Sequence, residues 1–217
     1  GAYEWDPFWA EADRIIHFGI DPWRILQPLL GHPLITWVIN FFYNLWLAIL
    51  FVMLYWQLLS RKDPDLRMRF FYTFVLTWAV NGTLLAILFA SGGPCFYEQL
   101  TGDAYYAPLM EYLESVREQY GLWALDTQET LWQRYQESTI MIGGGISAMP
   151  SVHVATTFLY LLLGLKMNKY WAGLFGFYFA VILIGSVHLG WHYAVDGYLA
   201  ILVTWLLWFG TGKLLSR

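Results

Sequence analysis

The chain has 217 residues, of which 58% are hydrophobic and only 13% are charged, and its mean hydropathy is +0.45. A soluble domain of this length carries far more charge, so the composition excludes one and indicates a single all-α integral membrane domain. The formal charge of −4 argues against a nucleic-acid partner, and the one cysteine, Cys95, excludes an internal disulfide.

The first 32 residues are predicted to lie in the membrane interface rather than to cross it. Asp-Pro occurs at residues 6–7 and 21–22, which is the pattern of an N-cap followed by proline at the first helical position. Residues 7–18 place five apolar side chains roughly on one face, and Gly31 ends the second helix. Segment 1–32 is therefore predicted to form two short amphipathic helices.

Residues 33–217 are predicted to form the catalytic membrane domain, a bundle of about five transmembrane helices. Each predicted span is an apolar run long enough, or nearly long enough, to cross the hydrocarbon core. The spans are placed at residues 34–59, 70–91, 150–165, 171–189 and 193–212.

A long segment between the second and third spans, residues 92–146, is too polar to cross the membrane. It predicts a helical cap that lies over the bundle, and long segments of this kind often act as lids or binding elements. One cap helix is expected from Pro108 to Tyr120, where Gly121 stops it. A second is expected to begin at Asp126, which with Glu129 resembles a capping box.

The basic residues divide unequally between the two sides of this bundle. One side has short segments that contain Arg61, Lys62, Arg67, Arg69, Lys166, Lys169, Lys213 and Arg217. The other side has much longer segments that contain Arg14, Arg24, Arg117 and Arg134. The positive-inside rule makes the first side cytoplasmic, in a plasma or inner membrane. The helical cap and the N-terminus then face outward, and an outward N-terminus predicts a further span upstream.

Two histidine-containing stretches fall at this outer boundary, where ionisable side chains indicate a functional site. His192 and Asp196 are four residues apart and would share a helix face, so the carboxylate can orient the imidazole and raise its basicity. Pro150 suits the first turn of the third span, which puts Ser151 and His153 at a helix N-terminus that binds phosphate. His192 is the predicted nucleophile, and His153 the predicted proton donor to the leaving oxygen.

Small and basic residues are predicted to complete the phosphate site. The candidates are Ser151, Ser147, Gly145, His188 and Arg134. Two of these have simpler interpretations, since the glycines at residues 143–145 can be a hinge and Arg134 can be a solvated cap charge. The spacing of His188, His192 and Asp196 would also fit a metal face, but Gly190 weakens a helix there. No metal and no cofactor is therefore expected.

The two stretches resemble the motifs of a known family. Residues 150–153, Pro-Ser-Val-His, look like the Pro-Ser-x-His motif of the type 2 phosphatidic acid phosphatase superfamily. Residues 192–196, His-Tyr-Ala-Val-Asp, look like the end of its third motif, His-x-x-x-Asp. The resemblance covers about residues 70–212 and implies a six-helix core, of which one span would lie upstream of this chain.

The resemblance also implies a role for each matching residue. The histidine of the third motif forms a phosphohistidine in that family, which corresponds to His192, and Asp196 orients it. His153 would be the acid and base, and Ser151 would contact the phosphate. Two phosphate clamps of the family have no match: Ser186 stands where the third motif has an arginine, and the first motif, Lys-x6-Arg-Pro, does not occur.

The residues of the two motifs are more similar to those of the inositol phosphorylceramide synthase and sphingomyelin synthase branch, whose enzymes move a phospho-headgroup between lipids. A site with fewer cations is better matched to a phosphodiester than to a dianionic monoester. The leading prediction is thus a metal-independent, inositolphosphotransferase-like phosphotransferase that uses a phospholipid in the bilayer. A lipid phosphatase is the close alternative, followed by a non-catalytic lipid-binding scaffold and a metal-dependent hydroxylase.

Overall fold

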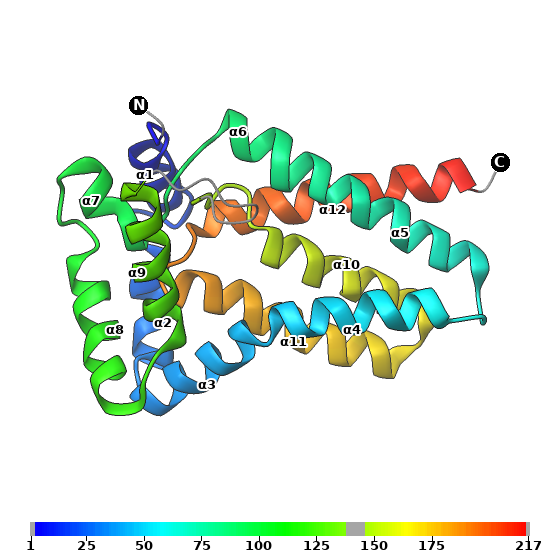
Figure 1. Cartoon of the computed structure of the whole chain (residues 1–217), viewed down its shortest axis with the longest axis horizontal. Coiled ribbons are helices and arrows are strands. Elements are labelled where there is room, and N and C mark those ends of the chain that lie inside the picture. Colours follow the sequence, from blue (N-terminus) through cyan, green and yellow to red (C-terminus); the bar gives the residue numbers. More distant parts are fainter. Residues whose placement is uncertain (1–2, 138–145, 216–217) are drawn as a thin grey trace.

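The protein is described here by a computed structural model, which places residues 3–137 and 146–215. All regular secondary structure in these two ranges is helical, so the predicted all-α membrane fold is confirmed. Long helices lie side by side along the molecule, and shorter helices cover one end of them (Figure 1). The N-terminus lies at the covered end and the C-terminus at the other (Figure 1).

Apolar helices form the long bundle. They are α3 (Pro33–Asn44), α4 (Trp46–Leu59), α5 (Pro64–Ala79), a π-helical turn (Val80–Leu85), α6 (Ala86–Leu88), α10 (Val152–Met167), α11 (Lys169–His188) and α12 (Ala194–Leu215). Four stretches of the described chain are long and apolar enough to cross a membrane, at residues 33–59, 64–88, 169–188 and 194–215. These stretches correspond to four of the predicted spans, which numbered about five.

The remaining predicted span, α10, is shorter than the others. Its 16 residues extend about 24 Å at 1.5 Å per residue, whereas a hydrocarbon core is about 30 Å thick. It packs against α5, α11 and α12, and nine of its residues are buried. Thus α10 is the central helix of the bundle, and its first turn lies beneath the covered end.

The two helices predicted in segment 1–32 are present, as α1 (Asp6–Ile16) and α2 (Pro22–Leu30). In α1 the buried residues are Asp6, Ala10 and Asp13. The apolar side chains of Phe8 and Ile15 are 54% and 67% exposed. The polar face of α1 therefore packs on the protein, and its apolar face is left to the lipid.

The helical cap consists of a 3-10 turn (Pro94–Phe96) and three α-helices, α7 (Tyr97–Thr101), α8 (Ala107–Tyr120) and α9 (Trp123–Gln136). As predicted, α8 ends at Gly121, whose φ of +72° suits glycine. The prediction of a capping box at the start of α9 is wrong. Asp126 and Glu129 instead pair with Arg117 of α8, at 2.8 and 3.2 Å, and α9 begins three residues earlier.

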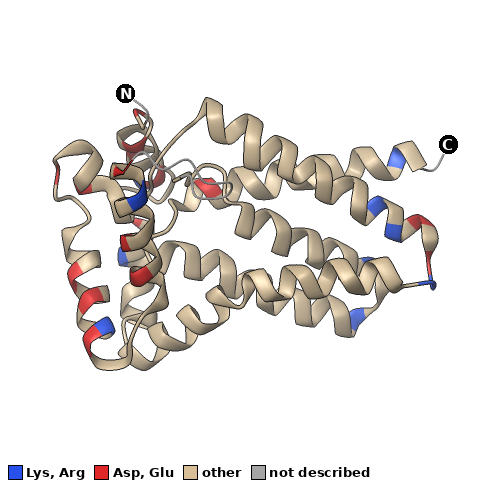
Figure 2. Cartoon of the chain, viewed as in Figure 1, with Lys and Arg blue, Asp and Glu red and all other residues tan. Residues whose placement is uncertain are grey.

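The two ends of the molecule differ in charge (Figure 2). Most of the acidic residues lie in the covered end, whereas basic residues gather at the opposite end, around the α4–α5 and α10–α11 connections (Figure 2). The sparsely charged bundle thus lies between an acidic end and a basic end, and the excess of lysine and arginine at one end is typical of a membrane protein with a fixed orientation.

Candidate active site

The two predicted histidines meet at the covered end of the bundle. His153 lies in the first turn of α10, and His192 lies in the turn between α11 and α12. Their ring centroids are 6.1 Å apart. The expectation that the fold joins the two motif stretches is confirmed.

One ring nitrogen of His192 is held by the protein, and the other is not. Nδ1 lies 2.7 Å from the carbonyl oxygen of Ala148 and 3.3 Å from Oδ2 of Asp196. A carbonyl oxygen only accepts hydrogen bonds, so Nδ1 carries the hydrogen and Nε2 carries the lone pair. No described residue hydrogen-bonds to Nε2. This nitrogen is therefore the one available for nucleophilic attack.

Asp196 reaches His192 by a route that differs from the predicted one. The two residues were expected to share a helix, but α12 begins at Ala194 and His192 precedes it. Asp196 instead folds back from the first turn of α12, and its Oδ2 accepts the N–H of Tyr193 at 3.0 Å. This is the reciprocal half of a capping box, and it carries the same carboxylate oxygen to His192.

Ser151 is the N-cap of α10 rather than a residue of its first turn, since Pro150 precedes the helix. Its side-chain oxygen accepts the N–H of Val154 at 3.4 Å, and its own N–H donates to the carbonyl of Asp196 at 3.3 Å. Ser151 is fully buried. It joins the start of α10 to the start of α12, and its hydroxyl retains a hydrogen to donate.

His153 is positioned by aromatic rings that the sequence analysis did not identify. Its imidazole stacks on Tyr43, with centroids 4.9 Å apart, and lies 4.0 Å from the ring of Trp46. The indole N–H of Trp46 donates to Oγ1 of Thr156, one helical turn along α10, at 2.8 Å. These contacts set the plane of the His153 ring while leaving its nitrogens unbonded by any described residue.

Asp6, the first of two acids missed by the sequence analysis, is fully buried at the start of α1. Its carboxylate accepts the N–H groups of Gly92 and Gly93 at 2.7 and 2.9 Å, and the hydroxyl of Tyr193 at 2.7 Å. Burial raises the pKa of Asp6, and these three donors oppose the rise. The residue ties α1 to the residue next to His192.

Asp13, the second acid, lies two helical turns further along α1. Its carboxylate accepts the N–H groups of Ala194 and Val195, at 2.7 and 2.8 Å, and so caps α12 from another helix. Burial raises its pKa to about 6. The seven-residue spacing of two acids in an amphipathic helix is the signal that might have revealed them, because it puts both on one face.

No hydrogen bond, ion pair or ring contact among the described residues joins His188, Arg134 or Ser147 to His153 or His192. His188 is buried, with Nε2 2.8 Å from Oγ1 of Thr36, which in turn lies 2.6 Å from the hydroxyl of Tyr112. Arg134 is exposed in the last turn of α9, and Ser147 is exposed before α10.

Gly145, with the rest of the glycine triplet, lies outside the described residues. No hydrogen bond or ion pair in the described chain joins a lysine or arginine to His153, His192 or Asp196. The metal face is not formed either, because α11 ends at His188 and α12 begins at Ala194. Among the residues placed, no three His, Cys, Asp or Glu side chains form a group suited to a metal ion.

His192 adjoins a small cavity. Its side chain is 6% exposed, and the adjoining cavity, which Asp13 and Tyr106 also line, measures only about 10 Å³. That is room for one water molecule at most. Pro22 and Val187 separate this cavity from an apolar groove of about 250 Å³ beside α2, because both residues line both spaces.

The sequence matches the family model of the PAP2 superfamily over residues 10–209. This range includes both histidine stretches and Asp13, and it extends well beyond the two motifs. No curated protein and no solved structure matches the chain.

Proposed function

The chain belongs to the PAP2 superfamily, whose members are phosphatases and phosphotransferases that act on lipid phosphates, and we propose that it is a lipid phosphotransferase. The observation that carries this proposal is the asymmetry of His192. Nδ1 contacts Ala148 and Asp196, whereas Nε2 has no hydrogen-bond partner in the described chain. The ring that carries this free nitrogen lies 6.1 Å from the ring of His153, centroid to centroid.

The proposed reaction has two displacements at phosphorus. In the first, Nε2 of His192 attacks the phosphorus of a phospholipid, the P–O bond to the donor lipid breaks, and His153 gives its proton to the departing oxygen. In the second, an acceptor hydroxyl gives its proton to His153 and attacks phosphorus, and the P–N bond breaks. His192 and His153 then return to their starting states, and no metal is consumed or required.

The charges around the site favour a phosphodiester donor. Three buried carboxylates lie close to this site: Asp196 contacts His192, Asp6 accepts the hydroxyl of the adjacent Tyr193, and Asp13 lines the cavity beside His192. No hydrogen bond or ion pair in the described chain joins a lysine or arginine to these three carboxylates. A dianionic phosphomonoester would be repelled more strongly than a monoanionic diester. This favours transfer of a headgroup, as in an inositolphosphotransferase, over hydrolysis of a lipid phosphate.

The apolar groove beside α2 suits the acyl chains of the donor. Ile25, Leu26 and Leu183 line it, and it opens toward His17 and Tyr198, which hydrogen-bond each other at 2.8 Å. Because the cavity between His192 and α2 measures only about 10 Å³, we expect α2 to move if a headgroup reaches His192 from this groove.

Product analysis by mass spectrometry tests the proposal. The purified protein is given mixed phospholipids with a chelator, with and without inositol, ceramide or diacylglycerol as acceptor. A new phospho-headgroup lipid is the expected product, and it should be missing with His192→Ala and His153→Ala but present with His32→Ala, an exposed histidine away from the site.

Other outcomes would replace the proposal. Free phosphate from a phosphomonoester, formed equally with and without acceptor, would make the protein a lipid phosphatase in which water is the acceptor. Lipid binding without any product, unchanged by His192→Ala, would make it a non-catalytic scaffold.

A further inference from the structure

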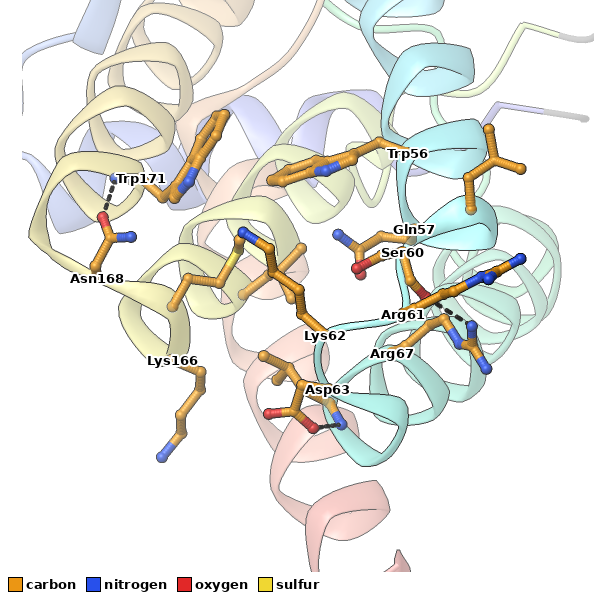
Figure 3. Close-up of a pocket in the computed structure, with 14 residues that line it drawn as sticks. Trp56, Gln57, Ser60, Arg61, Lys62, Asp63, Arg67, Lys166, Asn168 and Trp171 are labelled. Atoms are coloured by element: carbon orange, nitrogen blue, oxygen red, sulfur yellow. Dashed lines mark hydrogen bonds between the residues drawn. The ribbon is translucent and has the colours of Figure 1, made fainter.

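A second lipid-binding site is suggested by a large cavity at the basic end of the bundle, far along the molecule from the two histidines. It measures about 640 Å³, compared with about 10 Å³ beside His192. The ends of α4 and α10, the starts of α5 and α11, and the connections between them enclose it (Figure 3). Nothing in the proposed reaction uses this space, so the inference does not depend on that reaction.

Positive charge dominates the walls of this cavity. Four cationic side chains line it, Arg61, Lys62, Arg67 and Lys166, against the single carboxylate of Asp63. Asp63 is partly engaged, since it caps α5 by accepting the N–H of Leu66 at 2.9 Å. The cavity therefore offers an anion more charge than its own side chains neutralise.

The side-chain amide of Gln57, in the cavity wall, has no hydrogen-bond partner among the described residues. Gln57 is only 4% exposed, and no hydrogen bond to its side chain is made by any described residue. Its amide points into the cavity, toward the same space that the Lys62 side chain reaches (Figure 3). The amide atoms of Gln57 are not closed off from solvent, so this amide is free to hydrogen-bond to a polar ligand in the cavity.

The opposite wall is aromatic and apolar. Trp56 and Trp171 lie with ring centroids 4.6 Å apart, and Leu163 and Met167 complete the wall toward the bundle. Tryptophan rings favour the level of the lipid headgroups and the glycerol region. A cavity with a basic rim and an apolar floor fits an amphiphile better than a free inorganic ion.

We propose that this cavity binds the phosphate of an anionic phospholipid from the leaflet at the basic end. Lys62 and Gln57 hold the phosphate, and the rings of Trp56 and Trp171 pack beside the glycerol region. Basic pockets between transmembrane helices are suited to such headgroups, because both charge and desolvated donors are available. The bound lipid would also join the α4–α5 connection to the α10–α11 connection.

Binding in nanodiscs tests the proposal. Purified protein is reconstituted in phosphatidylcholine with increasing phosphatidylglycerol, and retained phosphatidylglycerol is counted by native mass spectrometry. Retention of one phosphatidylglycerol is expected in the wild type. Lys62→Gln should bind it about fivefold more weakly, the effect of one cation near an anionic headgroup.

Two further variants separate a specific site from general surface charge. Gln57→Glu keeps the shape of the side chain but adds a negative charge inside the cavity, so it should weaken retention at least as much as Lys62→Gln. Lys169→Gln removes the same charge at the same end but outside the cavity, where its ammonium lies over the ring of Tyr170. It should bind like the wild type.

The results that would overturn the proposal are specific. Equal loss with Lys62→Gln and Lys169→Gln would show only surface attraction, and retention in both Lys62→Gln and Gln57→Glu would show that the cavity is not the site. Displacement of phosphatidylglycerol by millimolar inorganic phosphate would show a free-phosphate site instead. Transferase activity is not used as a readout, so these results are independent of the proposed reaction.

Discussion

At the scale of single residues, the backbone holds His192 more closely than the carboxylate does. Nδ1 is 2.7 Å from the carbonyl of Ala148 and 3.3 Å from Asp196. The backbone contact fixes the tautomer, whereas the negative charge of Asp196 stabilises the cation that forms when Nε2 becomes bonded to phosphorus. The two contacts thus divide orientation and charge stabilisation between them.

Asp196→Asn separates these contributions. The asparagine oxygen still accepts the N–H of Tyr193 and the carbonyl of Ala148 still orients the ring, but the charge is lost. We expect the rate to fall roughly 10- to 100-fold, because a hydrogen bond to a charged group, worth about 1.5–3 kcal/mol, is weakened in the transition state. Turnover assays with thermal unfolding as a folding control measure this, and a full rate would show that Asp196 only caps α12.

Gly93 is a second residue whose identity the site requires. Its φ is +89°, and a Cβ built there would overlap the carbonyl oxygen of Trp191, next to His192. Gly102 has a similar φ of +77°, but a Cβ there would meet nothing within 4 Å. A comparison of alanine substitutions at Gly93 and Gly102 therefore separates the cost of the left-handed backbone, which both share, from the cost of steric overlap, which only Gly93 has.

Gly102→Ala should therefore lower the free energy of unfolding by about 1 kcal/mol, the effect of a left-handed non-glycine residue. Gly93→Ala should lower it by more and should also reduce turnover, because the Trp191 carbonyl must shift. Chemical unfolding in detergent, followed by tryptophan fluorescence, compares the two. Equal losses in stability would show that the chain at Gly93 relaxes without moving the site.

At the scale of elements, α1 links two separate segments of the chain at the covered end, and we call this link the clasp. Its two buried acids bind backbone N–H groups of two separate segments, Asp6 those of Gly92 and Gly93, and Asp13 those of Ala194 and Val195. Four N–H groups that no helix or sheet could satisfy are thereby paired. The clasp explains why a helix with an apolar surface turns its acids toward the protein.

Removal of one acid tests the clasp. Asp13→Ala leaves two buried N–H groups at the start of α12 without acceptors, and each such group costs about 1–3 kcal/mol. Stability and turnover should both fall, because the first turn of α12 carries Asp196. Glu11→Ala is the matched control, since Glu11 is an exposed acid of α1 that pairs with Arg14 on the surface. Similar effects in both variants would contradict the clasp.

The same residue predicts a pH dependence of stability. Burial is the main cause that raises the pKa of Asp13 to about 6; the N–H groups of Ala194 and Val195 oppose the rise, Asp196 adds to it, and His17 opposes it. A carboxyl whose pKa is higher in the folded than in the unfolded protein binds its proton more tightly when folded. Its contribution to stability is therefore lost as the pH rises from about 4 to about 6.

Asp13→Asn removes this titration while keeping an oxygen acceptor. The fall in unfolding free energy between pH 4 and pH 6 should be smaller in the variant than in the wild type, with Asp6 and the other carboxyls supplying the remainder. Chemical unfolding at a series of pH values measures the slope. Identical slopes in the two proteins would show that Asp13 does not titrate in this range.

At the scale of the whole molecule, charge predicts the orientation in the membrane. The basic connections gather at one end and the helical cap forms the other (Figure 2). By the positive-inside rule we expect the basic end to face the cytoplasm and the histidine site to face outward. Transfer would then take place at the outer leaflet, and the lipid at the basic cavity would come from the inner one.

Labelling with an impermeant thiol reagent on intact cells tests this orientation. The natural Cys95 is buried and should react little. Glu118→Cys in the cap should be labelled from outside, whereas Asp65→Cys at the basic end should react only after the cells are permeabilised. Both positions are exposed, so the comparison depends on the side of the membrane. The reverse pattern would invert the topology and the leaflets assigned to both sites.

Local features of the sequence were sufficient for the class of protein, most of the spans and the central pair of histidines. Apolar runs identify membrane helices because the bilayer demands about 20 such residues, and they did so for the helices that end at Leu59 and His188. Polar side chains stand out against that background, which is why His153 and His192 were found. Counting spans was enough to place them at the same end.

Only the tertiary structure decided what surrounds the histidines. Asp6 and Asp13 bind segments that lie far away in the sequence, and their hydrogen bonds go to backbone groups, which carry no residue-specific pattern. The stacking of Tyr43 on His153 likewise joins two helices whose registers are set by packing. A sequence records periodicity along one element, whereas these contacts depend on how separate elements are placed against one another, so folding alone brings them together.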